Sequence, residues 1–218
     1  MYHPIITHIS LCANLSMVLS GYNKLMIKVA IFDMNGVLIN DSGPLSQRIE
    51  KDFGISSEEF FPILKTALKQ VRVPGVNSSV AWQPVAEKLN MSNKDFFEYW
   101  FQGESLNADL LQYIKELKAQ GIKIIILSNN FPERTNSYRQ LYPELFSVVD
   151  EQYFSWETGK VKPSIEAYTQ IINKHAFSPA EYLFVDDKEE NLVVASGLGM
   201  TSLKYQNVEE IKRNINIQ

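Results

Sequence analysis

The feature that most constrains this chain is a short apolar run, residues 28–32 (KVAIF), that stops at the carboxylate of Asp33. Such a run is typical of a strand buried on both faces of a parallel sheet. In open α/β sheets, ligands bind at the carboxyl ends of the strands, so this acid is placed to meet a metal ion or a substrate. Gly36 then permits a tight turn whose backbone N–H groups can face an anion. By itself the stretch is equally compatible with an aspartate that only caps a turn.

Polar residues also follow a second predicted strand, residues 122–127 (IKIIIL). Ser128 and Asn129 come directly after it, and their hydroxyl and amide groups can hold phosphate oxygens. An ordinary helix N-cap is the alternative interpretation of the pair. Directly after a buried strand, we favour phosphate contact.

A third predicted strand, residues 182–185 (YLFV), ends in two acids, Asp186 and Asp187. Adjacent carboxylates repel each other, so a bound cation is the best reason to keep them together. Asn191 follows and can fix the turn. Lys162 precedes a helical pattern, where its ammonium group can serve as a fixed counter-charge. One acid, a Ser-Asn pair, a lysine and an Asp-Asp pair form a specific ordered set.

Strands that alternate with helices predict a three-layer α/β sandwich with a mainly parallel sheet. Between residues 41 and 104 the strand signal is replaced by helical periodicity, which predicts four short helices. The remaining elements are expected as helices at residues 106–120, 164–175 and 189–197 and as strands at residues 147–150 and 201–204.

These motifs resemble the haloacid dehalogenase-like (HAD) hydrolase superfamily over residues 26–200. The four motif blocks of that family are matched in order by FDMNGVL, ILSNN, GKVKPSIEAY and FVDDKEENL. The last two blocks are most similar to the phosphatase branch, which includes sugar-phosphate phosphatases and the N-terminal domain of soluble epoxide hydrolases. The resemblance implies a Rossmann-like core and a small helical cap that closes over the active site.

The resemblance assigns roles to the site residues. Asp33 is the expected nucleophile, which attacks phosphorus and forms an aspartyl-phosphate. Mg²⁺ is the expected cofactor, held by Asp33, by Asp187 as first choice, by Asp186 directly or through water, and by the backbone carbonyl of Asn35. Lys162 assists as a cation, since a carboxylate and a phosphate dianion repel each other. Ser128, Asn129 and Lys162 are the expected substrate-binding residues.

Asn35 is a departure from the family pattern, which usually has a second aspartate two residues after the first. That aspartate protonates the departing alkoxide and later deprotonates the attacking water, a contribution of about a hundred- to ten-thousand-fold. An amide does not titrate. Three outcomes follow: a slow phosphatase or one that recruits another acid, a phospho-enzyme that turns over poorly, or a protein that only binds phosphorylated ligands.

The expected domain organisation has three parts. Residues 26–41 and 105–218 form the core domain, and residues 42–104 form the helical cap. Residues 1–25 are interpreted as a dispensable tail, either disordered or an upstream start, and a targeting role is the less favoured alternative. They lack a basic region before their apolar patch, and the patch is too short and too polar to span a bilayer.

Composition restricts the classes of partner. A net charge of −4 and a pI near 5.5 give no electrostatic footprint for nucleic acid or for an anionic membrane. The single cysteine, Cys12, excludes an internal disulfide and indicates a reducing, cytoplasmic location. The expected partner is a small phosphorylated molecule, and the sequence predicts no particular oligomeric state.

The sequence therefore predicts a Mg²⁺-dependent phosphatase that acts on a small phosphorylated metabolite such as a sugar phosphate. A receiver domain is disfavoured because its paired acids come early in the chain. A dehalogenase of the same superfamily is disfavoured because it does not need Asp186 and Asp187. A non-catalytic protein that binds phosphorylated ligands is the serious alternative, and it rests on Asn35.

Overall fold

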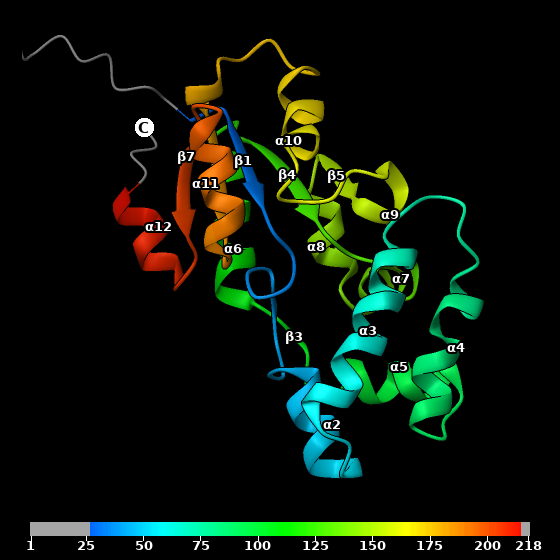
Figure 1. Ribbon diagram of the computed structural model, residues 1–218. Coiled ribbons are helices and arrows are strands. Elements are labelled where there is room, and N and C mark those ends of the chain that lie inside the picture. The colour runs from blue at the N-terminus through cyan, green and yellow to red at the C-terminus, as the bar shows by residue number, and fades with distance from the viewer. Residues whose placement is uncertain (1–26, 215–218) are drawn as a thin grey trace, which may run out of the picture.

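The computed structural model describes residues 27–214, which fold around a five-stranded sheet covered by helices (Figure 1). The strand order is β5-β4-β1-β6-β7, and every neighbouring pair is parallel. The strands are β1 (Val29–Phe32), β4 (Lys123–Ser128), β5 (Glu151–Phe154), β6 (Tyr182–Asp186) and β7 (Thr201–Lys204). The predicted Rossmann-like α/β sandwich with a parallel sheet and an inserted helical segment is confirmed.

The two faces of the sheet are buried under different helices, because successive side chains of a strand point to opposite faces. Ala30 and Phe32 of β1 pack in one hydrophobic cluster with α6, α7, α8 and α12, whereas Val29 and Ile31 pack in another with α10 and α11. These helices are α6 (Ala108–Ala119), α7 (Pro132–Leu141), α8 (Pro143–Val148), α10 (Ile165–Ile172), α11 (Glu189–Gly197) and α12 (Val208–Asn214). Burial on both faces explains why the central strands are uniformly apolar.

The prediction of a strand at residues 147–150 was wrong. α8 ends at Val148, and β5 begins at Glu151, directly after the predicted strand ends. Val148 packs half-buried against a hydrophobic cluster, so its β-branched side chain reflects burial and not sheet pairing. Asp150 lies just before β5, where its backbone N–H donates to the carbonyl of Ile124 and its carboxylate accepts from the N–H of Ile124, both at 2.8 Å.

Two predicted helices are shorter in the structure. The helix predicted over residues 106–120 is α6, which begins later because the segment before it forms β3 (Ser105–Leu106). The side chain of Asn107 caps α6 by accepting the backbone N–H of Leu110 at 3.2 Å. The helix predicted over residues 164–175 is α10, which ends three residues early. Two short helical turns complete the chain, α9 (Ser155–Thr158) and η2 (Pro179–Glu181).

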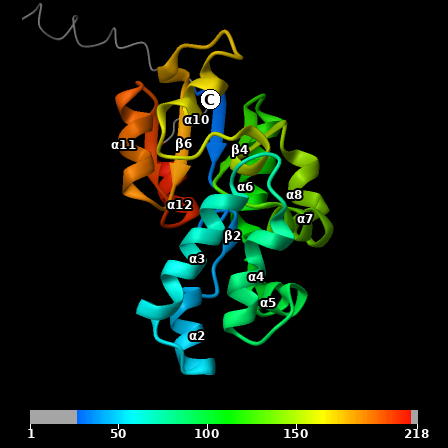
Figure 2. The same ribbon diagram turned by 45° about the vertical axis from the view of Figure 1, so that its right-hand side comes forward.

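Four helices lie between β2 (Ile39–Asn40) and β3, below the sheet in both views (Figures 1 and 2). They are α2 (Leu45–Phe53), α3 (Ser57–Val71), α4 (Ser78–Lys88) and α5 (Asn93–Phe101). β2 and β3 pair antiparallel, so the chain leaves and re-enters the core at neighbouring positions.

The inserted helices have a hydrophobic cluster of their own, which supports the proposed division into a core and a cap. Trp82 is fully buried at its centre and contacts Phe96 and Trp100. Phe131, from the loop between β4 and α7, joins this cluster with its ring centroid 4.8 Å from that of Trp82. One aromatic ring of the core thus anchors the inserted helices.

No helix within residues 27–214 has the length and apolar character needed to cross a membrane. The predicted dispensable tail, residues 1–25, lies outside the described residues.

Candidate active site

Three neighbouring strands bring the predicted site residues to one edge of the sheet. Asp33 directly follows β1, Ser128 ends β4 and Asp186 ends β6. Because β1 pairs with both β4 and β6, these three side chains lie close together. All three are buried, with at most 5% of each residue exposed.

The ammonium group of Lys162 lies between two of the acids. Its Nζ is 2.9 Å from Oδ1 of Asp33 and 2.6 Å from Oδ2 of Asp186, and its side chain is 1% exposed. Two carboxylates this close would repel each other without a cation between them. The lysine therefore offsets the repulsion between the two buried acids.

Asn129 fixes the backbone that carries this lysine. Its side-chain amide donates to the carbonyl of Lys162 at 2.7 Å and accepts the backbone N–H of Lys162 at 2.8 Å. Ser128 and Asn129 line the same small pocket as Asp33. The predicted phosphate contacts of Ser128 and Asn129 stay a prediction, and the observed role of the Asn129 amide is to position Lys162.

The two adjacent acids differ in their hydrogen bonding. Asp186 accepts the backbone N–H of Lys188 at 2.9 Å and the side-chain amide of Asn191 at 2.9 and 3.0 Å, in addition to Lys162. Within residues 27–214, Oδ1 of Asp187 is buried and has no hydrogen-bond partner. Asp187 is therefore the acid with a free ligand atom, whereas Asp186 is held by protein groups.

The arrangement fits a divalent cation. Asp33, Asp186 and Asp187 each offer a carboxylate oxygen, and these oxygens lie within 4.8 Å of one another. Oxygen-only ligands suit Mg²⁺. Burial, and next the negative charge of Asp33, raise the pKa of Asp187 to about 6. A cation at this position would favour the ionised form of Asp187 and so oppose this rise in pKa.

Gly36 makes the close approach of Asp187 possible. A Cβ atom at this position would lie 2.9 Å from Oδ2 of Asp187, which is closer than real Cβ contacts. The backbone of Gly36 also has φ +84°, a conformation that favours glycine. The predicted turn after the first strand is therefore built around the acid that follows β6.

Asn35 is held by two side chains of the core. Its Nδ2 donates to the hydroxyl of Tyr138 at 2.6 Å, and its Oδ1 accepts from Nδ2 of Asn130 at 3.2 Å. The hydroxyl of Tyr138 in turn donates to Oε2 of Glu104 at 2.5 Å. Burial is the largest cause that raises the pKa of Tyr138, so the hydroxyl keeps its proton. The amide of Asn35 is consequently fixed in one orientation.

The chain passes from the core to the inserted helices after β2 and returns before β3. Arg134 contacts both of these connecting segments. It forms an ion pair with Glu104, which precedes β3, and a second at 3.5 Å with Asp41, which follows β2. Its Nε also donates to the hydroxyl of Tyr138 at 2.8 Å. The position of the inserted helices is thus coupled to the group that holds Asn35.

A small pocket of about 70 Å³ lies over Asp33 and is rich in cations. Arg72, Arg134 and Lys188 line it together with the predicted residues Asn35, Ser128, Asn129, Lys162 and Asn191. Every residue that lines this small pocket is polar or charged.

Sequence reasoning missed four residues near this pocket: Arg72, Glu104, Arg134 and Tyr138. Pro132 at the first position of α7 was a usable signal for that helix, and Arg134 and Tyr138 are four residues apart on it, a spacing that puts them on one face. Arg72 and Glu104 carry no local signal, because they reach the site through the packing of the inserted helices.

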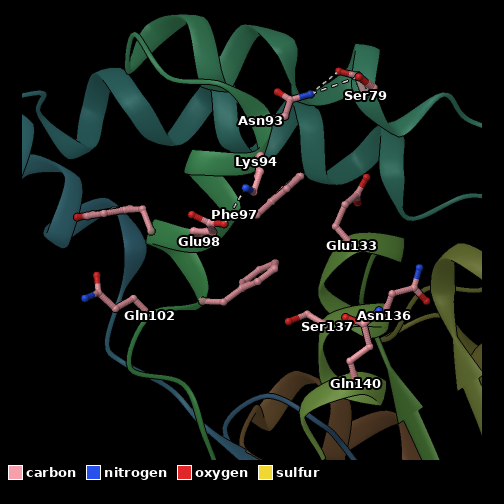
Figure 3. Close-up of a pocket in the computed structure, with 12 residues that line it drawn as sticks. Ser79, Asn93, Lys94, Phe97, Glu98, Gln102, Glu133, Asn136, Ser137 and Gln140 are labelled. Atoms are coloured by element: carbon pink, nitrogen blue, oxygen red, sulfur yellow. Dashed lines mark hydrogen bonds and ion pairs between the residues drawn. The ribbon is translucent and has the colours of Figure 1, made fainter.

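A larger pocket of about 1000 Å³ lies between α5 and α7, and Figure 3 shows it. Its residues include Phe97 and Gln102 on one side and Glu133 and Gln140 on the other. None of the predicted site residues lines it. The chemistry-bearing side chains are therefore in the smaller pocket.

Comparison with known families gives one match over most of the chain. The model of the haloacid dehalogenase-like hydrolases matches residues 27–199. This range covers four of the five strands of the sheet, the inserted helices and all the acids described above, and it ends just before β7.

Individual relatives are more distant. A sesquiterpene phosphatase of Aspergillus oryzae is 26% identical, over 81% of this chain and 88% of its own length. The bifunctional epoxide hydrolase 2 of Mus musculus is 23% identical over 87% of this chain, which spans 38% of that protein. A HAD family enzyme of Bacteroides thetaiotaomicron, solved in complex with magnesium and inorganic phosphate, superposes with a TM-score of 0.70 at 22% identity, over 85% of this chain and 98% of that one.

Proposed function

The chain belongs to the haloacid dehalogenase-like hydrolases, and from this premise we propose that it is a Mg²⁺-dependent phosphatase of small phosphorylated metabolites. The observation that carries the proposal is the pairing of buried Asp33 with Lys162 beside the unpartnered oxygen of Asp187. Its similarity to a sesquiterpene phosphatase and to a HAD family enzyme solved with magnesium and inorganic phosphate supports phosphoester hydrolysis as the reaction class.

Asp33 is the proposed nucleophile. The contacts of its carboxylate with the N–H of Met34 (2.7 Å) and with Lys162 (2.9 Å) both go to Oδ1, so Oδ2 has no hydrogen bond within the described residues. Attack by a carboxylate oxygen on phosphorus forms the aspartyl O–P bond and breaks the ester P–O bond. Water then attacks the same phosphorus, breaks the aspartyl O–P bond and releases inorganic phosphate.

Mg²⁺ would be held by Asp33, Asp187 and the backbone carbonyl of Asn35, with Asp186 as a further acid nearby. When bound, it supplies positive charge to the phosphoryl oxygens. Lys162 adds to this charge from the protein side, where the site excludes water and electrostatic effects are strong.

Asn35 makes the proposed phosphatase slow on esters with poor leaving groups. One N–H of its amide is donated to Tyr138, and the second can donate to the departing oxygen. The amide can donate a hydrogen bond but cannot transfer its proton, so the leaving alkoxide must take its proton from water. Esters with acidic leaving groups need little help of this kind.

The second candidate function is a protein that binds phosphorylated ligands without turnover. The observation that favours it is the fixed, non-titrating amide of Asn35 in the place of an acid. The pocket, the cations and the metal site serve this function equally well.

Release of inorganic phosphate from p-nitrophenyl phosphate and from a panel of sugar phosphates, with and without Mg²⁺, tests the proposal. We expect Mg²⁺-dependent activity that disappears in Asp33→Asn and rises about a hundredfold or more in Asn35→Asp. Activity that survives in Asp33→Asn would overturn the proposal. Activity that is found only in Asn35→Asp would establish the binding protein instead.

A further inference from the structure

One cationic residue from the inserted helical segment lines the pocket over Asp33. Arg72 directly follows α3, and it lines that pocket together with Lys162 and Ser128. Its Nε atom is buried without a hydrogen-bond partner, and the guanidinium forms no hydrogen bond or ion pair with any residue between 27 and 214. Arg72 as a whole is half-buried, and a half-buried guanidinium without a partner among residues 27–214 is unusual, because removing an unpaired charge from water is costly.

The loop that carries Arg72 is packed against the core. A Cβ atom on Gly159 would lie 3.3 Å from Cδ of Pro74, so the loop after α3 touches the loop that leads to Lys162. Figure 1 shows the upper end of α3 rising toward this part of the core. The loop that carries Arg72 thus lies against the core, and Arg72 itself forms no ion pair among residues 27–214.

Two neighbouring cations, Arg134 and Lys162, differ from Arg72 in having partners. Arg134 is paired with Glu104 and Asp41, and Lys162 with Asp33 and Asp186. Burial, and then the positive charge of Arg134, lower the pKa of Arg72, while Asp33 opposes this effect. Arg72 therefore has no paired anion among residues 27–214, although Asp33 lines the same pocket.

Charge counting identifies the missing anion. Three acids, Asp33, Asp186 and Asp187, and one lysine, Lys162, leave the site with two net negative charges. Mg²⁺ would neutralise these. A phosphate monoester dianion would then add two more negative charges, and half-buried Arg72 is a cation available to meet them, with exposed Lys188 lining the same pocket.

We propose that Arg72 is a phosphoryl-binding residue, so that the inserted helices close on the phosphate group of the ligand rather than on its organic part. This inference rests on the phosphoester chemistry proposed above and adds a specificity: the site selects monoester dianions. A phosphodiester, with one negative charge and a second organic group in place of an oxygen, meets Arg72 poorly. The guanidinium is suited to this because it offers several N–H donors in a planar fork.

Binding of inorganic phosphate in the presence of Mg²⁺, measured by calorimetry, tests the inference. Hydrogen bonds to charged groups correspond to about a ten- to hundredfold change in affinity, so Arg72→Ala should weaken phosphate binding by about that factor and Arg72→Lys by less. Lys69→Gln removes an exposed cation three residues earlier on α3 and should leave phosphate binding unchanged. Unchanged phosphate affinity in Arg72→Ala would overturn the inference.

Stability separates this role from a structural one. Because Arg72 has no hydrogen-bond or ion-pair partner among residues 27–214, Arg72→Ala should unfold in urea at the same or a higher midpoint than the parent chain without phosphate. A lower midpoint would instead mark Arg72 as a packing residue and overturn the inference. Phosphate binding through Arg72 without hydrolysis of any ester would refute the proposed phosphatase and leave this inference standing. Hydrolysis of esters together with unchanged phosphate affinity in Arg72→Ala would support the proposed phosphatase and refute this inference.

Discussion

The amide of Asn35 donates a 2.6 Å hydrogen bond to the hydroxyl of Tyr138, a residue 103 positions away in the chain. The same hydroxyl donates to Glu104, which is paired with Arg134. The residue that departs from the family pattern is therefore not a loose amide in the place of an acid. It is the end of a network of hydrogen bonds that includes Arg134, which pairs with an acid in each of the two segments connecting the core to the inserted helices.

Replacing Tyr138 by phenylalanine should lower both stability and turnover. The half-buried amide of Asn35 loses its acceptor, and an unsatisfied polar group costs up to about 1–3 kcal/mol in free energy of unfolding when it is buried. Turnover should fall as well, because the amide is no longer held in one orientation. Urea denaturation and phosphate release measure the two effects. Tyr142→Phe is the control, since it removes only a 3.2 Å bond to the carbonyl of Glu104; equal turnover in both variants would contradict the role assigned to Tyr138.

Replacing Lys162 by methionine should destabilise the metal-free protein strongly. Removing one partner of a buried ion pair costs about 3–5 kcal/mol, and here two buried acids, Asp33 and Asp186, lose their cation together. Urea denaturation measures the loss. Lys160→Met, in the same loop and without an ion pair among residues 27–214, should change stability little. Similar losses in the two variants would show that Lys162 does not neutralise the acids.

Gly36→Ala should weaken Mg²⁺ binding, because the new methyl group would lie 2.9 Å from Oδ2 of Asp187. Gly43→Ala is a matched control: Gly43 has φ +89°, similar to the +84° of Gly36, but open space where its Cβ would lie. Both variants should lose about 1–2 kcal/mol to backbone strain. Only Gly36→Ala should lose affinity for Mg²⁺ in a calorimetric titration, and equal affinities would remove Gly36 from the metal site.

The pH dependence of the free energy of unfolding should reflect the raised pKa of Asp187. Burial and the charge of Asp33 raise the pKa of Asp187 from 3.8 to about 6 in the metal-free protein. A carboxyl group that binds its proton more tightly in the folded state gives a stabilising contribution at pH values below 3.8, and that contribution is lost as the pH rises through about 6. Asp187→Asn should therefore unfold at higher urea than the parent chain at pH 7.5 and lose this advantage at pH 4.

The control for this experiment is Asp109→Asn, which changes an exposed acid in the first turn of α6. It should show no gain at pH 7.5. With Mg²⁺ present the advantage of Asp187→Asn should vanish, since the cation stabilises the parent chain through its ionised acid. A parent chain that remains less stable at pH 7.5 in saturating Mg²⁺ would contradict Asp187 as a ligand.

The amino-acid sequence was sufficient for most of the fold. The runs at residues 28–32, 122–127 and 182–185 are apolar over lengths that fit only buried strands, and each ends in the polar residues found at the sheet edge. The order of acid, Ser-Asn pair, lysine and acid pair fixed which residues would meet. Helical periodicity likewise located the helices of the insertion. These signals are local, because they depend on residues a few positions apart. The strand predicted at 147–150 was wrong for the same reason: local β-branching does not distinguish burial from pairing.

Only the tertiary structure decided which partner each polar group takes. It gave both oxygens of Asp186 to protein donors and left an oxygen of Asp187 free, although the two acids are neighbours in the chain. It also brought Tyr138 to Asn35 and Arg72 to the pocket over Asp33. The physical reason is that hydrogen bonds and ion pairs form between side chains far apart in sequence, whose approach is set by how whole helices pack on the sheet. Local hydrophobic pattern determines the elements, and packing determines the electrostatics of the site.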